Sequence, residues 1–227
     1  MTLQSRQLAL ARGSRLLFDH LDFEVAPGEA LHVAGRNGSG KTSLLRVLCG
    51  LAPPLHGELL WRGHPHADQI PHIRQTLVYI GHASGLKDDL TLGENLRIAS
   101  SLAGRACSRN DARQALRQLE LADRLDAPVR TLSQGQRKRA ALARLALSCT
   151  SRLIVLDEPF NALDHESTAL LTRLLNAHLG TGAILVYTTH QAAPMLGART
   201  HQVPLGVRAA SPNAVPTESI CHEPETC

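Results

Sequence analysis

The stretch Gly35 to Thr42 restricts the fold of this chain more than any other feature of its sequence. It reads GRNGSGKT, follows the apolar run ALHVA and precedes the helix-like run SLLRVLCG. Its glycines let backbone N–H groups approach phosphate oxygens at positions where a side chain would obstruct them. The spacing GxxxxGK[ST] between a strand and a helix therefore predicts a phosphate-binding loop.

The positions of this loop have distinct expected roles. Lys41 would reach the β- and γ-phosphates of a nucleotide as a positive charge, and the Thr42 hydroxyl would ligate Mg²⁺. The positive end of the following helix would add to the attraction for the anion. The expected phosphate-contacting residues are Gly35, Arg36, Asn37, Gly38, Ser39, Gly40, Lys41, Thr42 and Ser43. A glycine-rich turn that only joins a strand to a helix is the alternative.

Short apolar runs alternate with helical patterns along most of the chain. Buried strands are predicted at 30–34, 77–80, 153–156 and 183–187, and helices at 42–49, 111–121, 134–147 and 166–179. This alternation predicts an α/β fold with a parallel core sheet covered on both faces. Two strand-like pieces at 8–10 and 21–25, with no helix between them, predict a small antiparallel sheet at the edge.

The composition is that of an ordinary globular protein and excludes several functional classes. The 227 residues are 43% hydrophobic and 19% charged, which argues against a mainly disordered chain. Aromatic residues make up only 3%, too few for a protein that binds nucleic acid by stacking bases. The net charge of +4 permits anionic ligands. Five scattered cysteines without a CxxC pair favour a reduced, cytosolic protein.

The sequence contains no candidate membrane span and no typical signal peptide. No stretch approaches the ~20 apolar residues that a membrane helix needs. The first residues, MTLQSRQLALARGSR, lack the apolar centre and small-residue cleavage site of a signal peptide. Any role at a membrane is therefore expected to depend on a partner.

A second group of polar residues ends an apolar run at Arg152 to Pro159, which reads RLIVLDEP. Adjacent side chains at a strand end point in different directions. Asp157 is therefore expected to face Mg²⁺ while Glu158 faces the water that attacks the γ-phosphorus, a division that hydrolysis requires. Alone, such an acidic pair is also common as a helix cap or a surface turn.

A third motif, LSQGQ at Leu132 to Gln136, lies just upstream of the acidic pair. Ser133 and Gln136 have capping-box spacing at the start of a predicted helix, which leaves free N–H groups as an anion site. With the two motifs above, the chain resembles ATP-binding-cassette (ABC) ATPases over residues 1–205, although Gln134 replaces a glycine of the usual LSGGQ. The resemblance implies a homodimer in which Ser133, Gly135 and Gln136 close over the ATP of the second, head-to-tail subunit.

The resemblance also implies roles for residues further along the chain. Asn161 to Asp164, NALD, resembles the D-loop that crosses to the partner subunit, and Asp164 also has the side chain of a helix N-cap. His190 in YTTHQ resembles the switch histidine that contacts the γ-phosphate, a role that suits an imidazole able to accept and donate hydrogen bonds. The implied catalytic residues are Glu158, His190 and Lys41, with ATP and Mg²⁺ as ligands and Thr42 and Asp157 at the metal.

Two positions depart from most of the family. IGHASG places His82 where a glutamine usually contacts Mg²⁺ and links to the membrane subunit. Because Mg²⁺ prefers oxygen ligands, His82 is expected to act through a water or only in the mechanical link. The adenine-stacking aromatic residue of the family falls near Arg12, with Phe18 the nearest ring. Both are candidates for the adenine contact, since an arginine plane can also stack on a base.

Within the family, Gly81 to Leu96 together with DEPFNALD and TTHQ resembles the motor subunits of bacterial cytochrome c maturation systems. The resemblance implies a peripheral ATPase on the cytoplasmic face of the inner membrane, bound to integral membrane subunits of a haem-handling complex. Direct haem binding is not expected, because Cys221, His222 and Cys227 do not form CxxCH. The alternatives are the motor of another ABC importer or exporter, and a regulatory or nucleic-acid ATPase outside transport.

The domain organisation expected on these grounds is simple. Residues 1–205 would form one ABC ATPase domain, with a helical subdomain at about 85–140. The last residues, 206–227, are rich in Pro, Ser, Thr and Glu and are expected to form a flexible tail.

Overall fold

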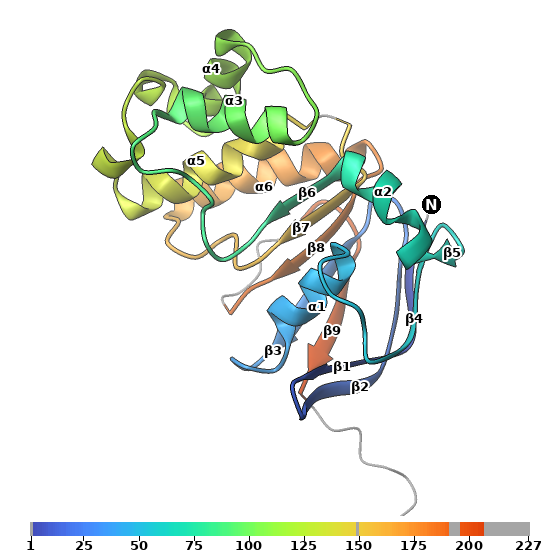
Figure 1. Ribbon diagram of the computed structural model, residues 1–227. Helices are drawn as coiled ribbons and strands as arrows, with labels where there is room; N and C mark the ends of the chain where they lie inside the picture. Colours follow the sequence, from blue (N-terminus) through green and yellow to red (C-terminus); the bar gives the residue numbers. More distant parts are fainter. Residues whose placement is uncertain (1, 149, 191–195, 207–227) are drawn as a thin grey trace, which may run out of the picture.

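The computed structural model describes residues 2–148, 150–190 and 196–206, which are built around two sheets (Figure 1). The larger sheet has five parallel strands in the order β6-β7-β8-β3-β9. Their bounds are β3 Ala30–Gly35, β6 Leu77–Ile80, β7 Leu153–Leu156, β8 Ile184–Thr188 and β9 Thr200–Leu205. The central strands β7 and β8 are buried throughout, as expected of a parallel sheet with both faces covered.

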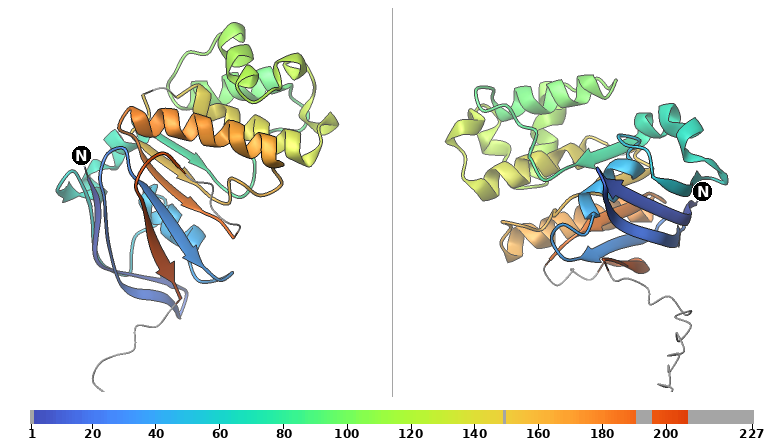
Figure 2. Two further views of the ribbon diagram at one scale, coloured as in Figure 1. Left: turned by 180° about the vertical axis from the view of Figure 1, so that it is seen from behind. Right: turned by 60° about the horizontal axis from the view of Figure 1, so that its bottom comes forward.

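The smaller sheet is antiparallel and has the strand order β2-β1-β4-β5. Its strands are β1 Leu3–Arg12, β2 Arg15–Val25, β4 His56–Trp61 and β5 His64–Pro65. One face of this sheet shares a hydrophobic cluster with the larger sheet and with helix α1, Lys41–Leu48. The second view of Figure 2 shows α1 between the two sheets, so the helix that follows the glycine loop is held on both sides.

Helices cover the other face of the parallel sheet and form a separate layer above it (Figure 1). The long helices are α5 Gln134–Ala146 and α6 His165–Gly180, which share one hydrophobic cluster with β7 and β8. The upper layer contains α3 Leu92–Leu102, α4 Arg109–Arg117 and the 3₁₀ turns Ala122–Arg124 and Val129–Thr131. Helix α2, His66–Thr76, lies beside the small sheet. None of the helices in the described residues is long and apolar enough to cross a membrane.

The structure confirms the α/β arrangement with a parallel core sheet and an antiparallel sheet at its side. It differs from the sequence-based expectation in the helix predicted at 111–121, which spans Arg109–Arg117. Ser108 caps this helix in a capping box with Asp111. Glu120, three residues after the helix ends, has a left-handed φ of +56°.

Four elements were not expected from the sequence: helix α2 and the strands β4, β5 and β9. Strand β9 includes Pro204 and ends at Leu205, directly before the tail expected at 206–227. Proline is tolerated there because β9 is the edge strand and pairs only with β3 among the described strands. Residues 207–227, which make up nearly all of the expected tail, lie outside the described residues.

Candidate active site

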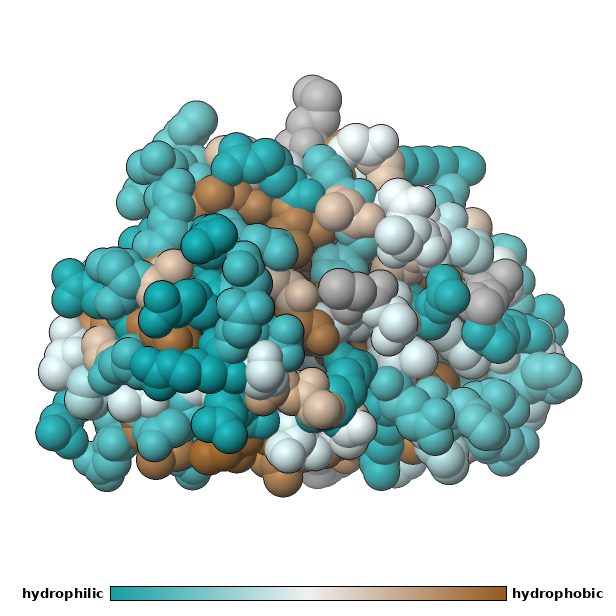
Figure 3. Space-filling model, turned by 90° about the horizontal axis from the view of Figure 1, so that it is seen from above, coloured by the Kyte–Doolittle hydropathy of each residue, from teal (hydrophilic) through white to brown (hydrophobic). Residues whose placement is uncertain are grey.

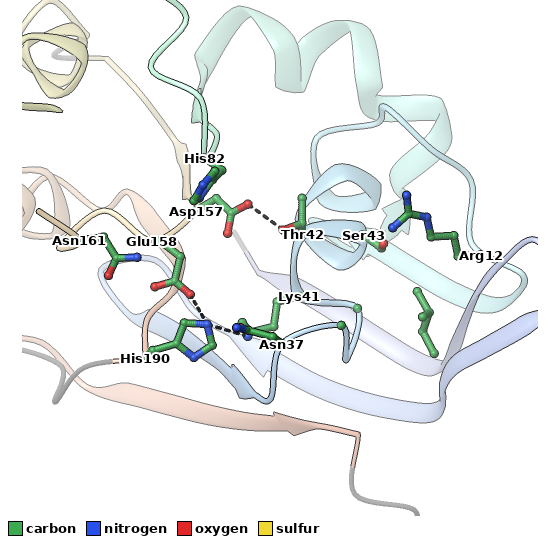
Figure 4. Close-up of a pocket in the computed structure, with 13 residues that line it drawn as sticks. Arg12, Asn37, Lys41, Thr42, Ser43, His82, Asp157, Glu158, Asn161 and His190 are labelled. Carbon is green, nitrogen blue, oxygen red and sulfur yellow. Dashed lines mark hydrogen bonds and ion pairs between the residues drawn. The ribbon is translucent and has the colours of Figure 1, made fainter. Parts of the chain in front are cut away.

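A cavity of about 390 Å³ opens at the carboxyl ends of the parallel strands, where the loop between β3 and α1 turns (Figure 4). Its lining residues are Arg12, Leu17, Asn37, Gly38, Gly40, Lys41, Thr42, Ser43, His82, Asp157, Glu158, Asn161 and His190. This edge of a parallel α/β sheet is where ligands usually bind. The fold therefore brings the glycine loop, the acidic pair and the histidine of three separate motifs into one site.

The glycines of the loop are required by close approach as well as by backbone conformation. A Cβ atom at Gly35 would come within 2.6 Å of Ser39 Oγ and 2.7 Å of the Leu205 carbonyl. Gly40 has φ +103° and leads directly into α1 as its N-cap. No side-chain cap occupies this helix end, so its first N–H groups remain available to an anion.

Lys41 lies inside the curve of the loop. Its Nζ donates to the carbonyl of Gly35 at 2.7 Å and to that of Arg36 at 3.3 Å, and lies 3.3 Å from His190 Nε2. The side chain is therefore held with its charge at the floor of the cavity, where a phosphate would need it. Gly35 and Arg36 contribute to the site through these carbonyls, although neither lines the cavity.

A chain of short hydrogen bonds connects α1, β7 and β8 beneath the cavity. Thr42 Oγ1 donates to Asp157 Oδ2 and Thr188 Oγ1 donates to Asp157 Oδ1, both at 2.8 Å. The Glu158 N–H in turn donates to Thr188 Oγ1 at 2.8 Å. Asp157 is only 3% exposed, and its oxygens and the Thr42 hydroxyl are the hard ligands that Mg²⁺ prefers. The chemistry and spacing of these groups fit a magnesium ion.

Glu158 has features of a residue held for function. It adopts φ +51°, an uncommon backbone conformation for a residue other than glycine. Its side chain is 8% exposed, and neither carboxylate oxygen has a hydrogen-bond partner among the described residues. His190 Nε2 lies 3.0 Å from Oε1, but the contact lacks the alignment of a hydrogen bond. A buried acceptor facing a cavity without a donor fits a water molecule that it would orient.

His190 lies between Lys41 and Glu158, as Figure 4 shows. In the neutral ring, Nε2 can accept from Lys41 or carry a proton toward Glu158, but it cannot do both at once. The histidine can therefore change partners when a phosphate group enters the cavity.

The two adenine candidates have different positions. Arg12 lines the cavity at the end away from Glu158 (Figure 4). Phe18 is 8% exposed and packs in the hydrophobic cluster between the two sheets, and it does not line the cavity. His82 is exposed and lies beside Asp157 in Figure 4, at the end of the cavity that holds the acidic pair.

The residues of the LSQGQ and NALD motifs, apart from Asn161, lie outside this cavity. Ser133 Oγ accepts from the Gln136 N–H at 3.2 Å, and Gln136 Oε1 accepts from the Ser133 N–H at 3.0 Å, which confirms the capping box. Asp164 caps α6 by accepting from the Ser167 N–H at 2.8 Å, and this hydrogen bond lowers the pKa of its carboxyl group. Apart from Asn161, the residues of the two motifs therefore lie at helix starts outside the cavity of their own chain.

Sequence reasoning missed Leu17, which lines the cavity, and Thr188, which lies beneath it. Thr188 is fully buried and joins Asp157 to the backbone of Glu158. The pattern YTTHQ contains it, but only its histidine was singled out. The signal that could have identified Thr188 is a hydroxyl side chain at the end of a buried strand.

Comparison with known proteins agrees with this geometry. The family model described as "ABC transporter" matches residues 18–161, which is more than half of the chain. The chain therefore belongs to the ABC transporter family, and it is an ATPase of that type. Within the family it is 50% identical over 192 residues to the "Cytochrome c biogenesis ATP-binding export protein CcmA" of Aromatoleum aromaticum, covering 85% of this chain and 90% of that protein. The protein of the same name from Pseudomonas aeruginosa is 44% identical over 198 residues, covering 87% and 97%.

Solved structures share the fold. A putative ABC transporter ATP-binding protein from Pyrococcus furiosus superposes with a TM-score of 0.76 at 22% identity, over 90% of this chain and 98% of that one. The ATP-binding cassette MJ0796, in a dimeric post-hydrolysis state with ADP and Pi, gives a TM-score of 0.72 at 24% identity, over 83% and 88%. These findings confirm the family and the fold that the three motifs predicted.

Proposed function

We propose that the chain is the ATP-hydrolysing motor subunit of a CcmAB-type ABC transporter complex that acts in haem handling and c-type cytochrome biogenesis. The names of its relatives support the biological role. The observation that carries the chemistry is the buried Glu158 carboxylate, which has no hydrogen-bond donor among the described residues and lies beside His190, itself in contact with Lys41.

The phosphate loop would bind the triphosphate of ATP. Lys41 would exchange its two backbone carbonyl contacts for phosphate oxygens, and the free N–H groups at the start of α1 would surround the anion. Thr42 and Asp157 would hold Mg²⁺, which when bound neutralises developing charge on the phosphates. Arg12, at the other end of the cavity, is the side chain available to stack on the adenine.

Hydrolysis would use Glu158 as the general base. Its carboxylate orients and deprotonates the attacking water, because it is the acceptor that the site leaves unpartnered. His190 would hold the γ-phosphate and that water in line, as its position between Lys41 and Glu158 allows. His82 would act through a water at Asp157 or in the mechanical link.

A homodimer would complete each site. Ser133, Gly135, Gln136 and Asp164 do not line the cavity of their own chain, which supports a role at the nucleotide of a second copy. The free N–H groups at the start of α5 would contact the γ-phosphate of the ATP that the partner chain binds. Two chains related by a two-fold axis would form two composite sites, because each chain supplies its loop to one site and its α5 start to the other.

Integral membrane subunits would receive the motion of this dimer. Helix α3 in the upper layer exposes Leu102 at 85% and Ile98 at 46%, and Figure 3 shows hydrophobic patches on the mostly hydrophilic upper face. Exposed apolar side chains support a protein partner at this face, next to the Gly81 to Leu96 segment. We assign these partners to CcmB-like and CcmC-like subunits, which would place the chain on the cytoplasmic face of the bacterial inner membrane. No contact with haem or nucleic acid is proposed.

Substitution of Lys41 tests this function. Lys41→Ala removes the charge that faces the phosphates, and we expect loss of detectable ATP binding and of turnover. Lys87→Ala removes an exposed lysine outside the cavity and serves as the matched control. Binding of a fluorescent ATP analogue and phosphate release measure the two steps. Parent-like binding by Lys41→Ala would refute the assignment of the site.

The role in cytochrome biogenesis needs a cellular readout. In bacteria that lack the native gene, the parent chain is expected to restore haem-stained c-type cytochromes and to co-purify with integral membrane subunits from detergent-solubilised membranes. Lys41→Ala is expected to co-purify but not to restore the cytochromes. Restoration by Lys41→Ala, or a parent chain that purifies without membrane subunits, would contradict the proposed role.

A further inference from the structure

The backbone N–H and carbonyl of Glu158 are each bound by a side chain, and the two side chains come from different elements. Thr188 Oγ1, at the end of β8, accepts from the Glu158 N–H at 2.8 Å. Lys138 Nζ, on α5, donates to the Glu158 carbonyl at 2.8 Å. The same carbonyl also receives a longer bond of 3.4 Å from the Asn161 N–H. The direction of the Glu158 side chain thus depends on contacts that fix both its backbone N–H and its backbone carbonyl.

Lys138 is well placed to transmit the position of its helix. It lies in the second turn of α5, three residues after Gly135, so both residues are on one face of the helix. On that face a Cβ at Gly135 would be 3.3 Å from the Ala162 carbonyl, so the first turn of α5 packs directly on the Glu158 to Asp164 segment. Helix α5 therefore touches this segment at two points, one of them the carbonyl of Glu158.

Glu158 needs such support because its backbone is strained. Its φ of +51° is unfavourable for a non-glycine residue and persists only when neighbours hold it. Burial lowers the pKa of Lys138, while the negative charges of Asp157 and Glu158 raise it. Lys138 is half-buried, and the charge-assisted hydrogen bond to the Glu158 carbonyl offsets part of the cost of removing its charge from water.

We infer that Lys138 is a positioning residue for Glu158, and that it makes the placement of this base depend on helix α5. The inference rests on the proposed role of Glu158. Helix α5 shares a hydrophobic cluster with α3 and α4, so a displacement of these helices reaches Glu158 through the Lys138 contact. The residue does not line the cavity and is not expected to touch nucleotide.

The test compares substitutions at Lys138 with a matched control on the same helix. Lys138→Met keeps the length of the side chain and removes the donor, and we expect kcat to fall at least about tenfold with KM for ATP changed less than about twofold. Lys138→Arg keeps a donor and is expected to recover most of the loss. The control is Arg139→Met, which removes a donor to the Leu119 carbonyl and is expected to keep parent-like turnover.

A double-substitution cycle separates positioning of Glu158 from a general structural effect. Because Lys138 acts through Glu158, Lys138→Met in a Glu158→Gln background is expected to cause no further fall in residual turnover. A parent-like kcat for Lys138→Met, or an equal fall in both backgrounds, would overturn the inference. If Lys138→Met does not fold, Lys138→Gln, whose amide is too short to reach, is measured by the same criteria. Parent-like turnover of Glu158→Gln alone would instead refute the proposed base.

Discussion

At the scale of single residues, the site is organised by Asp157, which binds one side chain from helix α1 and one from strand β8. Asp157 accepts from Thr42 on one oxygen and from Thr188 on the other. Glu158 is left with two buried oxygens that no described residue satisfies. Two neighbouring carboxylates therefore have different environments, one suited to holding a cation and the other to activating water.

Glu158→Gln keeps the shape of the side chain and removes the base. ATP binding is expected to stay within about twofold of the parent while turnover falls by about 10²-fold or more, because proton abstraction in the transition state is lost. The variant is also expected to accumulate as a nucleotide-bound dimer. Isothermal titration, phosphate release and size-exclusion chromatography with ATP measure the three properties. Unchanged turnover would exclude Glu158 as the base.

At the scale of elements, one buried amide organises the segment before α3. Asn95 is 6% exposed, and its Oδ1 accepts from the Lys87 N–H at 2.7 Å. Its Nδ2 donates to the carbonyls of Lys87 and Thr91 at 3.1 and 3.0 Å. The loop at 87–91 has no strand or helix of its own, so this side chain satisfies backbone groups that no ladder reaches.

Asn95→Leu tests that role. It leaves the Lys87 N–H without its side-chain acceptor and removes one of the donors to the Lys87 and Thr91 carbonyls, and we expect a loss of about 2 kcal/mol in the free energy of unfolding. Amide exchange is expected to accelerate at residues 87–91. Urea denaturation and hydrogen exchange measure the two effects. Arg97→Leu, an exposed position on the same helix, is the control and is expected to change stability by less than about 0.5 kcal/mol. Equal losses for both variants would contradict this role of Asn95.

At the scale of the whole molecule, the separation of the motifs carries the argument for a pair of chains. The phosphate loop lines the cavity, whereas Ser133 and Gly135 start a helix that does not reach it. In a head-to-tail dimer, one chain would supply the loop of a site and the other chain its α5 start. A defect in the loop of one chain and a defect in the α5 start of the other chain would therefore affect the same site.

Mixing two inactive variants tests this arrangement. Homodimers of Lys41→Ala and of Ser133→Arg each have two defective sites and are expected to be inactive. In the mixed dimer one site combines both defects and the other combines an intact loop with an intact α5 start. An equal mixture is expected to recover about a quarter of the parent's turnover, since about half of the dimers are mixed and each has one working site. A mixture as inactive as its components would argue against composite sites.

The glycine loop, four of the five parallel strands and the capping box of α5 could be predicted because each depends on neighbours in the chain. Gly35 to Thr42 carries its own turn chemistry, and Ser133 with Gln136 forms a cap within one helical turn. The signals are local, so a single sequence contains them in full. Strand β9 and helix α2 lacked such signals, because a short edge strand with Pro204 and a helix with Pro71 follow neither apolar period.

The contacts that make the site work join residues far apart in the chain. Thr42 meets Asp157 across 115 positions, and Lys41 meets His190 across 149. Which of Arg12 and Phe18 faces the cavity depended on how two sheets pack, and the Thr188 and Lys138 contacts with Glu158 depended on the placement of β8 and α5. Such pairings follow from the packing of whole elements, which is set by the summed burial of many side chains and not by any local pattern.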